Sequence, residues 1–346
     1  MTQSLSLSCE PVTLDLRTTF RIAHGASDQR HNVIAHLIDP ATGLNGLGEG
    51  AAVVYHGETQ AGIVAYLQQN AGLMGDDPYL IEDVLNRLPA GSQAARAAID
   101  IALHDLWGKC TGQPLYRLFG LNPDEAPLTS FTIAIDEPNL MAERARESGL
   151  KVIKIKLGGP DDLSAVEAIR NATDARLMVD ANAGWTREQA GFLIPRLVEF
   201  GIDFVEQPLP KGDIQGFRWL RESLQFQQID MPIFADESIK TARDVAAHAG
   251  AVDGVVIKLM KSGGIREALR AIHTARALDM QVMIGCMVES SVGVTAAAHL
   301  ASLCDYADLD GPLLIRNDPF TGLQYDGSRL VLPSGAGLGV SRREDS

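Results

Sequence analysis

Short apolar segments recur along the C-terminal two thirds of the chain, separated by longer amphipathic stretches. Each apolar segment runs for three to five residues and the spacing is roughly 25 residues, a pattern typical of β-strands alternating with helices. Thr186 with Gln189 and Thr241 with Asp244 have the spacing of capping boxes and predict two helix starts. Eight strands are predicted, at residues 131–135, 152–156, 177–180, 204–206, 233–236, 255–258, 282–284 and 306–308. The pattern predicts an α/β fold with a (β/α)8 TIM-type barrel.

The first third of the chain follows a different pattern. Apolar and polar positions alternate over residues 12–16 and again over 33–37, which predicts antiparallel strands. From residue 92 to 109, apolar positions recur every three or four residues and predict an amphipathic helix, with Asp100 and His104 off its apolar face. A run of glycines is expected to mark turns after the second strand; it comprises Gly43, Gly46, Gly48 and Gly50.

Three segments follow from these patterns. Residues 1–125 are predicted to form an α+β capping domain that covers the active site, and residues 126–322 to form the barrel. Residues 323–346 are expected to return to the capping domain. An open doubly wound sheet is disfavoured, because no G-x-G-x-x-G motif follows an early strand.

Composition narrows the class of function. Apolar residues make up 46% of the chain and charged residues 21%, near the averages of globular proteins, so a full core can be buried. The net charge of −14, without any run of Lys and Arg, argues against a nucleic acid or an anionic membrane surface as partner. We expect no secretory leader and no membrane span, and the four scattered cysteines lack disulfide or zinc spacing. A cytoplasmic protein with a small-molecule ligand is therefore expected.

Five consecutive barrel strands are predicted to end in a charged residue, and the carboxyl ends of barrel strands meet at one mouth. These residues are Lys156, Asp180, Glu206, Asp236 and Lys258. Any one of them alone could be a solvated loop residue, but five in succession would bring like charges together without a counter-ion. The three carboxylates offer hard oxygen ligands, so we expect a bound divalent cation, with Mg²⁺ preferred and Mn²⁺ as the alternative.

The lysines at the same strand ends indicate proton transfer. Lys154 and Lys156 share one face of their strand, because side chains alternate, and Lys258 is expected across the ring, four strands further on. A cation bound to a substrate carboxylate stabilises the enediolate that forms when the neighbouring proton leaves. One lysine could then remove that proton and the other return one to the opposite face. This two-base 1,1-proton transfer would invert the carbon.

The motifs around these residues resemble the muconate-lactonising subgroup of the enolase superfamily, whose established chemistry includes lysine bases with Mg²⁺. They are K-I-K at 154–156, D-A-N at 180–182, E-Q-P at 206–208, D-E-S at 236–238 and K-L-M-K at 258–261 before two glycines. The resemblance spans nearly the whole chain and implies a homo-oligomer. It implies Mg²⁺ on Asp180, Glu206 and Asp236, acid/base roles for Lys156 and Lys258, and contact of Lys154 with the substrate carboxylate. Lys261 is expected to be a solvated loop residue.

The end of the eighth strand resembles the dipeptide epimerases of that subgroup. Asp308 and Asp310 are expected to point into the mouth together and, as that resemblance implies, to hold the free α-ammonium of a dipeptide. The alternative is that Asp308 caps the following segment and Asp310 opens a turn. The favoured function is a Mg²⁺-dependent epimerase, similar to L-Ala-D/L-Glu epimerases, that inverts the α-carbon of the C-terminal residue of an L,L-dipeptide.

Two alternative functions stay open. The first is an N-acylamino acid racemase, an o-succinylbenzoate synthase or a cycloisomerase of the same subgroup, since all share the metal and the lysines. The second is a non-catalytic ligand-binding barrel. Exchange of a substrate α-proton with D₂O separates these classes, because a binding protein would not catalyse it.

Two loops of the capping domain are expected to set side-chain preference. In the first, His24 stands where Ala-Glu epimerases are expected to place an Arg against the distal carboxylate, and imidazole is a poorer carboxylate clamp than guanidinium. Arg21 could compensate for it. We therefore do not expect strict Ala-Glu specificity and leave hydrophobic second residues open. The second loop, residues 53–57, could line an apolar pocket or simply link a strand to a helix.

Overall fold

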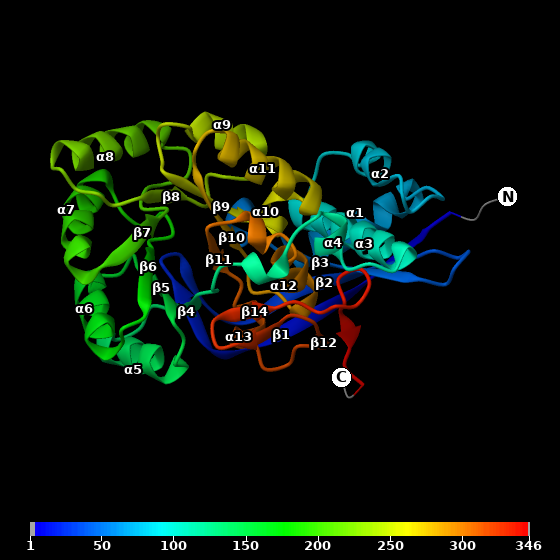
Figure 1. The fold of residues 1–346 in the computed structure, drawn as a ribbon, viewed down its shortest axis with the longest axis horizontal. Helices are drawn as coiled ribbons and strands as arrows, with labels where there is room; N and C mark the ends of the chain where they lie inside the picture. Colours follow the sequence, from blue (N-terminus) through cyan, green and yellow to red (C-terminus); the bar gives the residue numbers. More distant parts are fainter. Residues whose placement is uncertain (1–3, 345–346) are drawn as a thin grey trace.

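The computed structural model describes residues 4–344, which form two lobes packed side by side (Figure 1). Within these residues, the larger lobe holds one sheet of eight parallel strands in chain order. They are β4 (Phe131–Ile133), β5 (Val152–Lys156), β6 (Arg176–Asp180), β7 (Ile202–Glu206), β8 (Ile233–Ala235), β9 (Gly254–Lys258), β10 (Gln281–Gly285) and β11 (Tyr306–Asp308). A parallel bridge between Thr129, before β4, and Ala307 of β11 closes the ring. The predicted barrel is confirmed.

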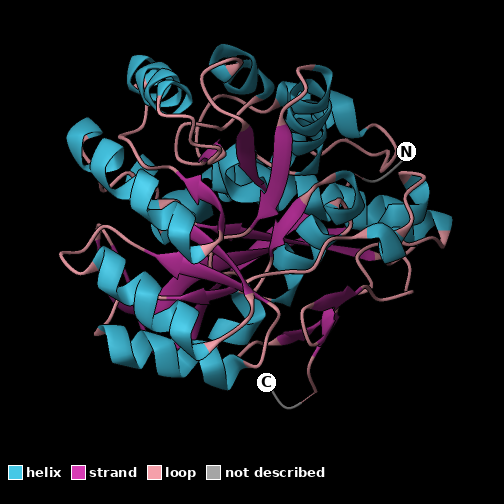
Figure 2. Cartoon of the chain, turned by 60° about the vertical axis from the view of Figure 1, so that its left-hand side comes forward, coloured by secondary structure: helices cyan, strands magenta, loops and turns pink. Residues whose placement is uncertain are grey.

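Helices surround the strands on the outside of the ring (Figure 2). They are α5 (Pro138–Ser148), α6 (Asp162–Ala172), α7 (Arg187–Leu197), α8 (Ile214–Phe226), α9 (Ala242–His248), α10 (Leu259–Ser262), α11 (Ile265–Ala277), α12 (Ser291–Ala298) and α13 (Gly311–Leu314). Thr186 and Thr241 form the two predicted capping boxes at the starts of α7 and α9. The helix after β11 is a single turn, α13, so the eighth βα unit is shorter than the others.

Alternation along β5 decides which side chains line the inside of the barrel. Ile153 and Ile155 pack outward in the main core, while Val152 lies in a separate apolar cluster on the inner face with Lys154 and Lys156 above it. This inner cluster contains Val152, Met178, Phe204, Phe234, Val256 and Met283. It fills the lower barrel, so the polar side chains at the strand ends face the mouth.

The smaller lobe consists of an antiparallel sheet in the order β1, β2, β3 with helices packed on it. Its elements are β1 (Ser6–Ile22), β2 (Gly25–Ile38), β3 (Asn45–Ala51), α1 (Gln60–Asn70), α2 (Ile81–Arg87), α3 (Gln93–Thr111) and α4 (Leu115–Leu118). Gly46, Gly48 and Gly50 lie inside β3, so the prediction that they mark turns is wrong. A Cβ on Gly48 would lie 1.9 Å from the carbonyl oxygen of Ala98, because α3 packs directly on the backbone of the strand.

The long hairpin of β1 and β2 extends from the smaller lobe to the barrel (Figure 1). Near its tip, the carbonyl oxygen of Arg21 accepts a hydrogen bond from the backbone N–H of Ile135, at 3.0 Å. Ala23 packs against Gly158 and Gly184, which follow β5 and β6. The hairpin tip therefore lies beside the barrel mouth.

The lobes also meet along α3 and the C-terminal segment. Asp100 and His104 of α3 are buried although they lie off its apolar face, and Asp100 accepts a 2.6 Å hydrogen bond from the N–H of Ile265 at the start of α11. In the C-terminal segment, the N–H of Leu338 donates to Asp105 of α3, at 2.7 Å. The short strands of this segment are β12 (Phe320–Thr321), β13 (Gln324–Asp326), β14 (Arg329–Val331) and β15 (Ser341–Arg342).

Two expectations from the sequence concern membrane spans and disulfide bonds. Among residues 4–344, no helix is long and apolar enough to cross a bilayer. All four cysteines are unpaired.

Candidate active site at the barrel mouth

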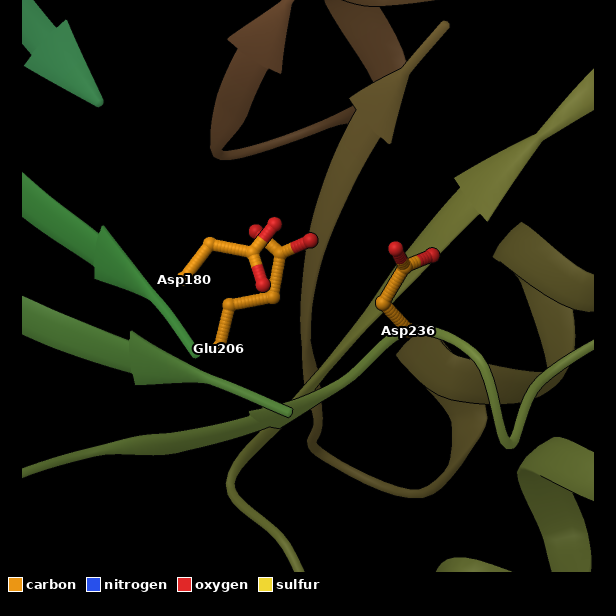
Figure 3. Close-up of side chains that lie close together, drawn as sticks. All are labelled: Asp180, Glu206 and Asp236. Carbon is orange, nitrogen blue, oxygen red and sulfur yellow. The ribbon is translucent and has the colours of Figure 1, made fainter. Parts of the chain in front are cut away.

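Three carboxylates from adjacent strands converge at the mouth (Figure 3). Asp180 ends β6, Glu206 ends β7 and Asp236 follows β8, and one oxygen of each lies within 4.8 Å of the others. Each is at most 1% exposed. Parallel strands side by side bring their carboxyl ends to one edge, which explains why residues some 30 positions apart meet here.

The hydrogen bonding of Glu206 shows that this group fits a divalent cation. Among residues 4–344, both of its carboxylate oxygens are buried without a hydrogen-bond donor, and the ammonium of Lys154 forms an ion pair with it at 2.7 Å. Burial and the neighbouring Asp180 raise the pKa of Glu206 well above its usual range. A buried carboxylate with unused lone pairs is costly, and a cation would satisfy it. Three carboxylate ligands without His or thiolate suit Mg²⁺ better than zinc.

Lys154 lies at the centre of the buried charges. Its side chain is fully buried, and its Nζ lies 2.7 Å from Glu206, 2.9 Å from Asp308 and 3.2 Å from Asp180. Burial alone would lower the pKa of Lys154, but Asp308 and the other carboxylates outweigh it and raise the pKa well above its usual value. Lys154 therefore stays charged. It links Asp180 and Glu206 of the candidate cation site to Asp308 at the end of β11.

Lys156 and Lys258 flank the carboxylates from opposite parts of the ring. The Nζ of Lys156 donates to Asp180 at 2.6 Å, and the Nζ of Lys258 donates to Asp236 at 2.8 Å. They end β5 and β9, which lie four strands apart. Burial would lower the pKa of Lys258, but Asp236 raises it well above its usual value, so Lys258 is protonated beside Asp236.

The prediction that Lys261 is a solvated loop residue is wrong. It lies in the one-turn helix α10, three residues after Lys258, and is 1% exposed. The helical turn brings its side chain back beneath the mouth. Its Nζ donates to the carboxylate Oδ1 and the carbonyl oxygen of Asp236 and to the carbonyl oxygen of Val256. Asp236 is therefore held by a lysine on each carboxylate oxygen.

Asp308 and Asp310 lie together on the side of the mouth nearest β4. Asp308 accepts hydrogen bonds from the hydroxyl of Ser130 at 2.5 Å and from Lys154 at 2.9 Å. Asp310 accepts one from the N–H of Thr132 at 2.7 Å. Burial and the charge of Asp308 raise the pKa of Asp310 to about 7. The two carboxyls thus form a buried acidic pair.

The capping loops contribute two side chains of different character. His24 is exposed at the tip of the hairpin, outside the buried charge cluster, and Arg21 is exposed as well. In the second loop, the hydroxyl of Tyr55 is buried without a hydrogen-bond partner in the described structure. Burial and Asp236 raise the pKa of Tyr55 well above its usual value. The loop therefore brings a phenol near the charged centre, which its sequence alone does not reveal.

Asn182 and Glu237 support the carboxylates from the loops after β6 and β8. Asn182 has a positive φ of 44°, and its N–H and side-chain amide both donate to Asp180. The same amide donates to Glu237 at 3.1 Å. Burial and the charge of Asp236 raise the pKa of Glu237 to about 7. Both residues belong to the D-A-N and D-E-S motifs, whose letters alone do not show this bond between loops.

Comparison with protein families gives two matches that together cover most of the chain. Residues 7–120 match the N-terminal domain of the mandelate racemase/muconate lactonizing enzyme family, and residues 139–346 match the enolase C-terminal domain-like family.

Three similar proteins are two epimerases and one racemase. The chain is 40% identical over 338 residues to an L-Ala-D/L-Glu epimerase of Bacteroides thetaiotaomicron, covering 96% of this chain and 86% of the relative. Its fold is similar to that of a dipeptide epimerase from Enterococcus faecalis solved with Mg and L-Leu-L-Tyr, with a TM-score of 0.92, 36% identity and coverage of 98% and 100%. It is also similar to an N-succinyl Arg/Lys racemase from Bacillus cereus, with a TM-score of 0.92, 30% identity and coverage of 99% and 96%.

Proposed function

Since the chain belongs to the mandelate racemase/muconate lactonizing enzyme family of the enolase superfamily, we propose that it is a Mg²⁺-dependent dipeptide epimerase. It would invert the α-carbon of the C-terminal residue of an L,L-dipeptide. The observation that carries the proposal is the buried pair of Asp308 and Asp310, joined through Lys154 to the carboxylates of the cation site.

The pair of lysines supports a two-base mechanism. Asp180, Glu206 and Asp236 would hold Mg²⁺, which supplies positive charge to stabilise an enediolate of the substrate carboxylate. Lys156 and Lys258, on opposite sides of this centre, would each face one side of the α-carbon. One takes the proton and the other returns one to the opposite face. Lys154, held charged among carboxylates, would contact the substrate carboxylate.

The acidic pair supports a substrate with a free amino terminus. An ammonium between Asp308 and Asp310 would form charge-assisted hydrogen bonds and would replace the proton that Asp310 holds near neutral pH. An N-acylated substrate has no cation to offer, so the buried pair would gain no charge-assisted hydrogen bond from it. This difference favours dipeptides over N-acylamino acids.

A second candidate is an N-acylamino acid racemase. The similarity to the N-succinyl Arg/Lys racemase favours it, because the metal and the lysines are expected in both kinds of enzyme. Chiral analysis with Mg²⁺ of L-Ala-L-Xaa dipeptides and of the same dipeptides with an N-acetyl group separates the two. We expect epimerisation of the free dipeptides alone, and turnover of the acetylated forms alone would contradict the proposal.

We also propose that the second residue of the dipeptide is not restricted to Glu. His24 is exposed at the hairpin tip, and the other capping loop offers the phenol of Tyr55 and the side chain of Val54, which is 77% exposed. Neither loop places a guanidinium among the buried charges described above. Rates for L-Ala-L-Phe and L-Ala-L-Glu test this directly: a strict preference for Glu would overturn it.

A further inference from the structure

Two glutamates outside the group of cation-site carboxylates lie near each other at the junction of the lobes. Glu49 lies on β3 of the smaller lobe, and Glu289 lies in the barrel loop between β10 and α12. They are 0% and 1% exposed. Two buried carboxylates in contact would repel each other strongly unless one of them keeps a proton.

Glu49 is surrounded by hydrogen-bond donors. Its oxygens accept from the N–H of Ser290 at 3.0 Å, the hydroxyl of Ser290 at 2.6 Å, the N–H of Gly293 at 2.9 Å and the amide of Asn32 at 2.8 Å. Ser290 is the N-cap of α12, so Glu49 reaches across the junction to the positive end of a barrel helix. Such a set of donors stabilises an ionised carboxylate.

Glu289 has the opposite surroundings. Its Oε1 accepts one hydrogen bond, from the N–H of Met287 at 2.7 Å, and its Oε2 is buried without a hydrogen-bond partner in the described structure. A Cβ built on Gly293 would lie 2.2 Å from Oε2 of Glu289 and 3.1 Å from Oε2 of Glu49. The unpartnered oxygen of Glu289 and the donor-rich oxygen of Glu49 therefore lie beside the same point.

We propose that Glu289 keeps its proton at neutral pH and donates it through Oε2 to the carboxylate of Glu49, which fastens the smaller lobe to the barrel. A protonated Oε2 gains the acceptor it lacks, and the pair carries one negative charge instead of two. The charged and titratable groups that face Glu289 are Glu49, Lys258 and Cys286. Besides Glu289, the groups that face Glu49 on the barrel side are the neutral Ser290 and Gly293.

The contact between Glu49 and Glu289 positions the two capping loops relative to the barrel. Glu49 lies six residues before Tyr55, and Val288 beside Glu289 packs in a cluster with Leu16 and with Phe20 of the β1–β2 hairpin. A shift of this junction would move both loops relative to the lysines. This part of the inference rests on the proposed epimerase function, whereas the shared proton does not.

Burial raises the pKa of both glutamates, and it raises that of Glu289 well above its ordinary value. The charge of Glu49 raises the pKa of Glu289 further, whereas the hydrogen bonds from Ser290, Asn32 and Gly293 lower that of Glu49, which agrees with a proton on Glu289. An acid whose pKa is higher in the folded than in the unfolded chain stabilises the fold below its unfolded pKa, and that contribution is lost as the pH rises through the folded value. The junction should therefore weaken on the alkaline side.

The test is thermal unfolding of the full chain with Mg²⁺ from pH 5 to 9, comparing wild type with Glu289→Gln. The glutamine amide donates to Glu49 without taking up a proton, so we expect equal Tm at pH 5 and a Tm higher than wild type by about 2 °C or more at pH 9. A Tm deficit of Glu289→Gln that grows with pH would overturn the shared proton.

Glu49→Gln is the matched control. The NH2 group that replaces one oxygen of Glu49 cannot accept from the donors on that side, so we expect a lower Tm at every pH. A variant Glu49→Gln that is tolerated while Glu289→Gln is not would place the proton on Glu49 and contradict the assignment.

The positioning role has its own readout. In Glu49→Gln we expect the KM for the dipeptide to rise about tenfold or more with kcat less affected, and in Glu289→Gln we expect both to stay near wild type. A Glu49→Gln protein with lowered Tm and unchanged KM would overturn the positioning role alone. An enzyme without epimerase activity would leave the melting result standing, so the two failures are distinguishable.

Discussion

The barrel mouth and the lobe junction both bury carboxylates, but they compensate the negative charge in different ways. At the mouth, lysine ammonium groups lie within 3.2 Å of Asp180, Glu206 and Asp236, and Glu206 still has unused oxygens. At the junction, Glu49 is compensated by N–H and hydroxyl donors and, as we infer, by a proton held on Glu289. The mouth therefore keeps carboxylate oxygens that a cation can take up, whereas at the junction most acceptor positions are already filled by fixed donors.

This difference distinguishes carboxylates that can take part in a reaction from carboxylates that hold the structure together. A buried charge such as that of Glu49, whose partners are mostly backbone, hydroxyl and amide donors, has few acceptor positions left for a substrate. A charge held by other ionisable groups can exchange protons with them. Burial alone therefore does not mark a catalytic carboxylate; the kind of partner does.

The largest effect should come from removing a mouth lysine. Lys156→Ala and Lys258→Ala are expected to lower epimerisation by about 10²–10⁴-fold, because each loses one proton-transfer group. The rate of inversion of L-Ala-L-Xaa, measured by chiral chromatography, checks this. Lys151→Ala, at an exposed position before the same strand as Lys156, is the matched control. Near-normal turnover of either active-site variant would refute the two-base mechanism.

The second prediction contrasts a neutral isostere at the mouth with one at the junction. Lys261→Met removes a buried cation and leaves Oδ1 and the carbonyl oxygen of Asp236 without their donor, so we expect a loss of about 3–5 kcal/mol in unfolding free energy. Urea unfolding measures this value. Glu289→Gln should show no such loss. Equal unfolding free energies of Lys261→Met and Glu289→Gln would contradict the proposed difference between the mouth and the junction.

The third prediction concerns the acidic pair. Asp310→Asn should lower kcat/KM for free dipeptides by about 10- to 100-fold, since a charge-assisted contact to the substrate ammonium is lost. Steady-state kinetics with L-Ala-L-Xaa checks this, and Asp326→Asn in the C-terminal segment is a control for an ordinary Asp. An unchanged kcat/KM would place the ammonium elsewhere.

The smallest expected effect is the change with pH of the KM for a free dipeptide. Asp310 has a pKa of about 7 and loses its charge below that pH, so the substrate ammonium should bind better at pH 7 than at pH 6. The α-ammonium of a free dipeptide stays mostly charged over this range, so we expect KM to rise by about fivefold between pH 7 and pH 6. The KM of Asp310→Asn should be flat over this range, and a parallel rise in that variant would assign the effect to another group.

The sequence predicts the mouth well because its information is local. Each strand is a short apolar run that ends in one charged residue, so Asp180, Glu206 and Asp236 can be placed by counting along the chain. Alternation in β5 correctly puts Lys154 and Lys156 on the inner face. Roles in substrate binding and proton transfer remain predictions.

The features that the sequence does not reveal depend on non-local packing or on the local path of the chain. Glu49 meets Ser290 across 241 positions, and no periodicity links them. Lys261 looks solvated because polar loop residues usually are, but the single turn of α10 returns it to Asp236. Gly48 resembles a turn residue, although its period of two with Gly46 and Gly50 is the pattern of a strand face. A helix packed on that face was the missing information.

The most direct test of the central claim is exchange with solvent. The purified protein with Mg²⁺ is incubated in D₂O with a library of L-Ala-L-Xaa and L-Xaa-L-Glu dipeptides, and mass spectrometry locates the incorporated deuterium. We predict one deuterium at the α-carbon of the C-terminal residue, together with inversion of that carbon and none at the N-terminal residue. An absence of exchange across the library, with exchange of N-acylamino acids under the same conditions, would contradict the account.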